Sequence, residues 1–156
     1  MHKAGALLSR RAYSRGELRG KLSGLPVKPE ELEGVLDRLE ELDLLNDAKY
    51  AYNFASNRIK EKGWGPLKVR HALLRRMVPA PTVESALGRV RSEAGDRPLL
   101  ERYLERYWRT RKIPGNRDEL RRLIGHLSRR GYRDELIVDV LRRAVPGEAW
   151  ISTESD

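Results

Sequence analysis

Apolar residues recur along the chain at the spacing of amphipathic helices. Between residues 29 and 45 they stand at steps of three and four, as Leu32, Val35, Leu36, Leu39, Leu42 and Leu45. Such spacing gathers them on one face of a helix. Pro29 suits the first turn of this helix, and Glu30, Glu31 and Glu33 lie near its positive N-terminal end. Because no stretch alternates apolar and polar residues as a β-strand does, the pattern predicts an all-α fold.

The helical pattern repeats along the chain. The segment from Ser14 to Leu22 matches the segment from Asn116 to Ile124, and each opens with a capping residue followed three positions later by glutamate, the capping-box pattern. Between them, Pro66 replaces the box as the helix starter. Three sets of residues keep a register of 51 positions: Leu18, Val69 and Leu120; Leu22, Leu73 and Ile124; Arg19, Arg70 and Arg121. The chain is therefore predicted to consist of three repeats.

Each repeat is predicted to contain three helices. They are placed at 4–13, 15–24 and 29–45, then at 47–62, 66–77 and 81–94, then at 97–112, 117–130 and 133–145. The repeats span 1–46, 47–96 and 97–146, and a polar C-terminal tail, 147–156, is expected to be frayed. A three-helix unit of about 50 residues can barely bury its own apolar face. We therefore expect a tandem array of three three-helix repeats, elongated and curved.

Charge adds a second theme. The chain carries 32 Lys and Arg against 23 Asp and Glu, a net charge of +9, and its pI is near 10.1. Residues 1–46 hold eight basic and eight acidic side chains, 47–96 hold ten and five, and 97–156 hold fourteen and ten. A basic excess of this size favours a polyanionic partner, with the middle repeat as the main contact surface. Arginine-rich solvated helices, favoured in a thermophilic host, are the alternative explanation.

Basic residues flank a short turn, Gly63-Trp64-Gly65. The candidate binding residues on either side of it and in the third repeat are Arg58, Lys60, Lys62, Lys68, Arg70, Arg75, Arg76, Arg117 and Arg121. Together they can neutralise several phosphates or meet an acidic protein. Trp64 itself either stacks on a base or partner side chain, or fills the gap between repeats. Tyr103, Tyr107 and Trp108 are interpreted as inter-helix packing.

Catalytic chemistry finds little support. There is no cysteine, and His71 and His126 lie singly within helices, where we interpret them as half-buried residues rather than metal ligands. The glutamates near residues 30–41 fit a solvated helix face better than a catalytic pair. We therefore expect no enzyme, no cofactor and no metal. No segment is apolar enough for a membrane span or a signal peptide, which favours a cytoplasmic protein.

The middle of the chain resembles a known family. The run from Leu39 to Ala51, with Phe54, Arg58, Lys62-Gly63-Trp64-Gly65-Pro66 and Val69-Arg70-His71-Ala72-Leu73, resembles the central signature of the bacterial RecX regulators. The segments 6–14 and 126–132 are similar to the first and last repeats of that family. Two turns depart from the pattern, because Asp43 and Met77 stand where the family often has glycine.

The resemblance implies a function. RecX proteins are three tandem three-helix repeats that lie along the groove of a RecA–DNA filament and limit its extension, ATP hydrolysis and strand exchange in recombination and the SOS response. The expected partners are the RecA filament and single-stranded or double-stranded DNA, bound by a monomer. The alternative is a helix-turn-helix type protein that binds duplex DNA without RecA, and a nuclease with carboxylate-bound magnesium is a third reading.

Overall fold

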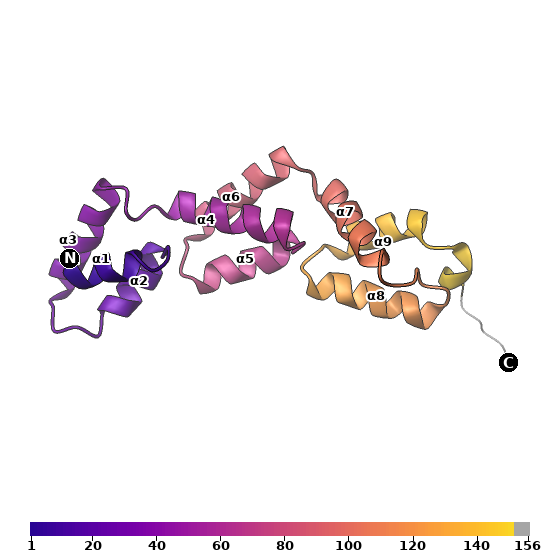
Figure 1. Cartoon of the computed structure of the whole chain (residues 1–156), viewed down its shortest axis with the longest axis horizontal. Helices are drawn as coiled ribbons and strands as arrows, with labels where there is room; N and C mark the ends of the chain where they lie inside the picture. The colour runs from indigo at the N-terminus through magenta and orange to yellow at the C-terminus, as the bar shows by residue number, and fades with distance from the viewer. Residues whose placement is uncertain (152–156) are drawn as a thin grey trace. The chain divides into compact units, whose positions relative to one another are not determined.

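The computed structural model describes residues 1–151. Within that range the backbone forms nine α-helices and no β-strand, which confirms the predicted all-α class (Figure 1). Three helices fall within each predicted repeat, although the repeat boundaries themselves stay predictions. They are α1 (His2–Leu8), α2 (Arg15–Leu22), α3 (Pro29–Glu41), α4 (Asp47–Ser56), α5 (Pro66–Arg75), α6 (Ala80–Glu93), α7 (Asp96–Trp108), α8 (Arg117–Arg129) and α9 (Asp134–Ala144). A π-helical segment, η1 (Asn57–Glu61), extends α4, and a 3-10 helix, η2 (Gly147–Trp150), follows α9.

Side-chain caps begin at least three of the helices, among them α4, where the Asn46 side-chain oxygen accepts a hydrogen bond from the Lys49 amide at 3.0 Å. At α2, the Ser14 hydroxyl accepts a hydrogen bond from the Glu17 amide at 3.0 Å, and the Glu17 carboxylate accepts one from the Ser14 amide at 3.1 Å. This confirms the predicted capping box. At α8, Asn116 accepts from the Glu119 amide at 2.9 Å, but the Glu119 carboxylate turns to the amide of Gly115 at 2.8 Å. The second half of that box is therefore shifted by one residue.

Several helices end earlier than predicted. Helix α1 stops at Leu8 instead of position 13, because the following residues leave the helix and bury Tyr13 and Ser14. Helices α3 and α5 stop before Asp43 and Met77, whose φ angles of 57° and 61° lie in the left-handed region that terminates helices. These are the two turns at which the family resemblance led us to expect glycine. Helix α7 likewise ends four residues before the predicted position.

The chain divides into two compact units. Unit 1 contains residues 1–55 and 70–89, which include α1, α2, α3 and most of α6. Its best-defined core consists of Ala4, Tyr13, Leu18, Leu22, Leu36, Leu39 and Leu45. In the leucine stripe that predicted α3, Leu36 and Leu39 are buried, whereas Leu42 is 46% exposed because the helix ends before it.

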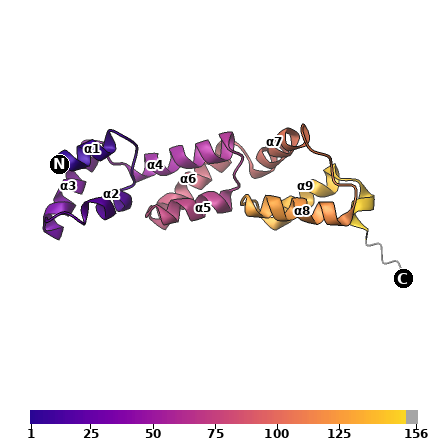
Figure 2. The same ribbon diagram turned by 60° about the horizontal axis from the view of Figure 1, so that its bottom comes forward.

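Unit 2 contains residues 56–69 together with the chain from Val90 onward. Helices α8 and α9 lie side by side in both ribbon views (Figures 1 and 2). They close a core with α7 and η2 that consists of Leu100, Leu104, Leu120, Leu123, Leu127, Tyr132, Ile137, Val140, Leu141, Val145 and Ala149. Ala149 is fully buried, so the predicted fraying is wrong for residues 147–150. The rest of the predicted tail, 152–156, lies outside the described residues.

Each unit contains a loop packed against a turn that is distant in sequence. In the first joint, loop residues 12–16 of unit 1 meet the turn formed by Arg76 and Met77, and the Ser14 hydroxyl donates a hydrogen bond to the Arg76 carbonyl. In the second joint, loop residues 63–67 of unit 2 meet the turn 130–132. There the Gly65 amide donates to the Arg130 carbonyl at 2.7 Å, and the Leu67 amide to the Gly131 carbonyl at 3.0 Å.

Candidate functional site

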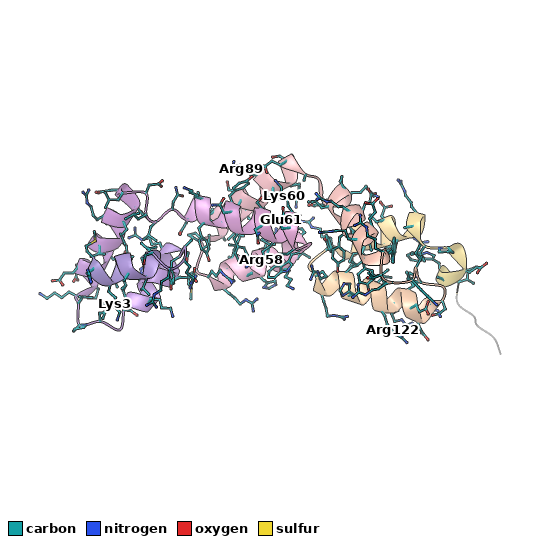
Figure 3. The ribbon with its side chains drawn as sticks, viewed as in Figure 1. Lys3, Arg58, Lys60, Glu61, Arg89 and Arg122 are labelled. Carbon is teal, nitrogen blue, oxygen red and sulfur yellow. The ribbon has the colours of Figure 1, made fainter. Side chains whose placement is uncertain are left out.

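The candidate binding residues around Trp64 begin on an irregular helical turn. In η1 the Lys62 amide donates to the Asn57 carbonyl at 3.2 Å, five residues back, and the Trp64 amide donates to the Arg58 carbonyl at 2.9 Å. This π-helical geometry widens the turn and is rare in proteins, where it often marks a functional site. Figure 3 shows Arg58 and Lys60 on this segment, beside Glu61.

Two glycines bring the loop of the second joint against its turn. A β-carbon on Gly65 would overlap the backbone of Gly131 and Tyr132, and a β-carbon on Gly131 would overlap Lys68. Gly131 also has a φ of 98°, which L-residues rarely adopt. The buried Tyr132 hydroxyl donates to the Gly63 carbonyl at 2.8 Å. The joint is therefore held by backbone contact and hydrogen bonds, and its side chains project from a defined backbone.

The structure brings Arg58, Trp64 and Lys68 together at this joint. The Lys68 amine lies 4.2 Å from the centroid of the Trp64 ring, and the Arg58 guanidinium carbon lies 5.4 Å from it. Both distances are within the range of cation–π attraction. Trp64 is half-buried and lies outside the described core clusters of both units. Its ring therefore contacts the two cations and remains partly accessible.

A candidate residue that the sequence analysis did not single out, Arg130, completes the group. The Arg130 guanidinium donates to the Lys62 carbonyl and lies 5.1 Å from the centroid of the Tyr103 ring. Its Nε atom is buried and has no hydrogen-bond partner among the residues that the structure describes. Arg130 follows Arg76, its counterpart in the first joint, by 54 positions instead of 51, so the register used to compare the repeats did not align them. We name Arg58, Lys62, Trp64, Lys68 and Arg130 the Trp64 cluster.

The surroundings of Lys68 in this cluster change its pKa. Burial, and secondly the positive charge of Arg130, lower the pKa of the Lys68 amine. Within residues 1–151, none of Lys62, Lys68 and Arg130 forms an ion pair with a carboxylate. The cluster therefore concentrates positive charge that aromatic rings and backbone carbonyls offset only in part.

Other predicted residues have partners within the fold. Lys60 lies 2.7 Å from the Glu93 carboxylate. Arg70 binds Glu84 through two hydrogen bonds, of 2.5 and 3.0 Å, and this contact raises its pKa. A guanidinium that is already bidentate with a carboxylate has to give up that contact before it can bind a phosphate. Arg70 is therefore placed as a tie between α5 and α6 of unit 1.

The remaining predicted residues lie away from the cluster or serve the first joint. Arg76 lies 4.6 Å over the Phe54 ring and donates to the Ala72 carbonyl at 3.1 Å, whereas Arg75 is exposed at the end of α5. Arg117 and Arg121 are exposed on α8. The rise of an α-helix places them about 20 Å and about 14 Å along its axis from Arg130, so they form a separate basic face.

The histidines and tyrosines form no described metal site. His71 is exposed rather than half-buried, because α5 buries the neighbouring positions Val69, Ala72 and Leu73. The half-buried His126 ring stacks on Tyr107 at 5.1 Å, and its Nε2 atom shares a hydrogen bond of 2.7 Å with the Tyr103 hydroxyl. In the described part of the chain, no group of three or more potential ligands could hold a metal ion. No described helix has both the length and the apolar character needed to cross a membrane.

Comparison with known proteins identifies the family. The family model for the second three-helix domain of RecX matches residues 46–87. A regulatory protein RecX from Prosthecochloris aestuarii is 39% identical over 87 residues, which are 56% of this chain and 58% of that protein, so the match leaves more than a third of the relative uncovered. A regulatory protein RecX from Pseudomonas syringae pv. tomato is 34% identical over 134 residues, which cover 84% of this chain and 82% of that protein.

The fold agrees with this assignment. The crystal structure of RecX from Lactobacillus salivarius matches with a TM-score of 0.71 at 22% identity, and the match covers 91% of this chain and 92% of that one. At this identity the structural likeness supports the fold alone. The family assignment rests on the identity and coverage of the P. syringae match. Sequence relatives, family model and fold agree: this chain belongs to the RecX family of regulatory proteins.

Proposed function

We propose that this protein regulates RecA, mainly as an inhibitor, by binding the RecA–DNA filament and modulating its extension, ATP hydrolysis and strand exchange. This would make it part of homologous recombination and the SOS response, in the cytoplasm where RecA works. The observation that carries the proposal is the Trp64 cluster of a chain of the RecX family. Arg58 and Lys68 lie over the Trp64 ring there, and none of Lys62, Lys68 and Arg130 forms an ion pair with a carboxylate within residues 1–151.

The physical basis is multivalent attraction. A filament repeats the same protein and phosphate surface along its axis, and a chain built from repeats can place several modest contacts on it. Linked contacts raise the overall affinity well above that of each alone. The net charge of +9 adds long-range attraction to the polyanion and speeds encounter. A monomer suffices for this mode of binding.

The direct test is the ATPase activity of RecA on single-stranded DNA, with this protein added below one copy per RecA protomer. We expect inhibition that grows with its concentration and is present at these low ratios, because each bound copy blocks further growth of a filament. A variant with Lys68, Arg75 and Arg58 changed to alanine should inhibit less and keep its helical content, since all three lie outside the described core clusters and partly exposed charges contribute little to stability. Arg70 and Arg76 are excluded from it because of their contacts with Glu84 and Phe54.

The alternative function is a helix-turn-helix type protein that binds DNA without RecA. The basic helix pairs and the salt-sensitive attraction fit both functions. Affinity for RecA filaments and for bare DNA, measured at physiological salt, separates them. A regulator of RecA should bind filaments far more tightly than bare DNA, whereas equal affinities and an unchanged RecA ATPase would favour the alternative.

A further inference from the structure

We propose that the second joint holds the phosphate backbone of single-stranded DNA, with Lys62, Lys68 and Arg130 as the groups that neutralise it. The inference rests on the proposed function and deepens it, because it assigns this surface to the DNA of the filament and not to the RecA protein. It also adds Arg130, which the sequence pattern did not single out.

The three cations come from separate segments that the joint fixes in place. Lys62 follows η1, Lys68 stands in the first turn of α5, and Arg130 follows α8. The Arg130 side chain donates to the Lys62 carbonyl, and the Gly131 backbone lies directly against Lys68. Because Gly65 and Leu67 bond to the same turn, the backbone positions of all three residues are set by these contacts. A backbone that is already fixed does not have to be ordered when a ligand binds, which lowers the entropic cost of binding.

The like charges of this group favour an anion. Lys68 lies over the Trp64 ring and Arg130 over the Tyr103 ring, and neither forms an ion pair within residues 1–151. Burial first, and the charge of Arg130 second, lower the Lys68 pKa, as expected where two like charges lie close together. An anion that enters between them replaces this repulsion by attraction, and it gains more than an anion binding at an isolated surface lysine.

The character of the site favours a nucleic-acid strand over an acidic protein segment. A DNA strand carries a phosphate about every 3.4 Å in a duplex, so consecutive phosphates can meet several converging cations. Aromatic rings beside cations are the composition used for single strands, whose exposed bases lie next to the backbone. The Arg130 fork suits a phosphate because a guanidinium donates two parallel hydrogen bonds to it.

The test uses the full chain without RecA. Binding of a fluorescein-labelled oligodeoxythymidine is followed by fluorescence anisotropy across a salt series, for the wild type and for the variant Lys62→Gln/Lys68→Gln/Arg130→Gln. We expect at least a tenfold loss of affinity at low salt and a log–log salt slope that is shallower by about 0.7 for each cation removed. The matched control, Lys112→Gln/Arg133→Gln/Arg143→Gln, removes three exposed cations from the same unit and should keep most of the affinity.

Two further arms keep the result decisive. Since the Arg130 side chain also bonds within the joint, the double variant Lys62→Gln/Lys68→Gln is measured beside the triple, and melting curves report folding of both. If the triple does not fold, the double variant decides, with an expected slope change of about 1.4. An oligodeoxythymidine with an uncharged methylphosphonate backbone should bind the wild type no better than the triple variant binds the natural strand.

The outcomes separate this inference from the proposed function. A folded variant with unchanged affinity and salt slope overturns the phosphate site, as does equal binding of the uncharged strand. Unchanged DNA binding with loss of RecA ATPase inhibition also overturns it, because the surface then contacts RecA, while the regulatory function stands. If the wild type leaves the RecA ATPase unchanged but the triple variant loses DNA affinity, the proposed function fails and the phosphate site is supported.

Discussion

The two joints share a backbone plan and differ in how they treat charge. In both, a loop meets a turn whose arginine, Arg76 or Arg130, gives its carbonyl to the loop and lays its guanidinium over a ring, Phe54 or Tyr103. At the first joint, however, Arg15 is held by the carboxylates of Glu33, Asp37 and Glu40, at 2.7 to 3.0 Å. At the second joint Pro66 occupies the equivalent position, and Lys68 turns to a ring.

This difference distinguishes cations that stabilise the fold from cations that remain for a binding partner. In repeat 1, basic side chains form ion pairs with carboxylates of the same repeat, consistent with the balanced charge of residues 1–46. The pair Arg19–Glu33 recurs 51 positions later as Arg70–Glu84, with the same pattern of a guanidinium Nε bonded to a carboxylate. These two arginines are therefore tied to carboxylates within the fold, whereas Lys68 has no carboxylate partner within residues 1–151.

The largest effect is expected from Gly131→Ala at the second joint. The new β-carbon would overlap Lys68, and the φ of 98° strains any side chain, so we expect a loss of about 2 to 5 kcal/mol in the free energy of unfolding. Gly16→Ala at the first joint should cost less, because it crowds Met77 without a positive φ. Thermal and urea unfolding measure both, with Gly147→Ala, which faces open space, as the control. Equal small losses at 131 and 147 would contradict the close contact.

Tyr132→Phe removes one hydrogen bond from the second joint without changing its shape. The buried Gly63 carbonyl loses its donor, and we expect a loss of about 1 to 2 kcal/mol in the free energy of unfolding. The chevron or equilibrium urea midpoint reports it. Tyr107→Phe, on a half-buried ring with no described hydroxyl bond, serves as the control and should change the midpoint little. A neutral result for both would mean that water replaces the lost donor.

Removing carboxylates from the first joint should make it resemble the second. In Glu33→Gln/Glu40→Gln, Arg15 and Arg19 lose carboxylate partners. In the wild type, the hydrogen bonds from Arg19, and secondly from Arg15, lower the Glu33 pKa to about 2. We expect single-stranded DNA to bind a few-fold more tightly at low salt, with a salt slope steeper by about 0.7 for each phosphate gained. Glu30→Gln/Glu31→Gln matches the change in charge at exposed positions away from Arg15. An equal gain in DNA affinity in both variants would show that net charge alone, and not the release of Arg15 and Arg19, causes the effect.

The smallest expected effect is a pH dependence carried by His126. Burial, and secondly the charges of Arg130, Arg129 and Arg111, lower its pKa in the folded state, whereas in the unfolded chain it stays near 6.5. The unfolded chain therefore binds the proton more readily. The contribution of His126 to the free energy of unfolding is therefore complete above about pH 6.5 and is lost as the pH falls below that value. Melting temperatures between pH 5 and 8 should fall toward acid in the wild type and less so in His126→Gln. Parallel curves would contradict this assignment.

Much of the fold follows from local signals in the sequence. Periodic leucines placed α3, Pro66 and the Ser14 box placed the starts of α5 and α2, and α8 begins at the predicted residue. Helix ends were less predictable. Asp43 and Met77 adopt a conformation that favours glycine, and only tertiary packing imposes it on other residues.

The candidate site was predictable only in part. Charge and the short turn pointed to Arg58, Trp64 and Lys68, which the structure does bring together. Arg130 was missed because α8, at 13 residues, is longer than α5, at 10, which moves the turn after it out of the 51-residue register, and because its proximity to Lys62 exists only after folding. The tie between Arg70 and Glu84 was not predicted, because the sequence analysis placed Arg70 on the binding surface. Its signal is that Arg70 and Glu84 stand 51 positions after Arg19 and Glu33, which form the same pair.

The contact between Gly16 and Met77 has an evolutionary consequence. A β-carbon at position 16 would fall on the β-carbon of Met77, so the two positions share room for a single side chain although 61 residues separate them. Among relatives, alanine or serine at the position of Gly16 should appear together with glycine at the position of Met77. The pair should behave as an epistatic unit: a β-carbon at position 16 alone is selected against, but it persists where glycine, which also suits the positive φ at position 77, replaces Met77.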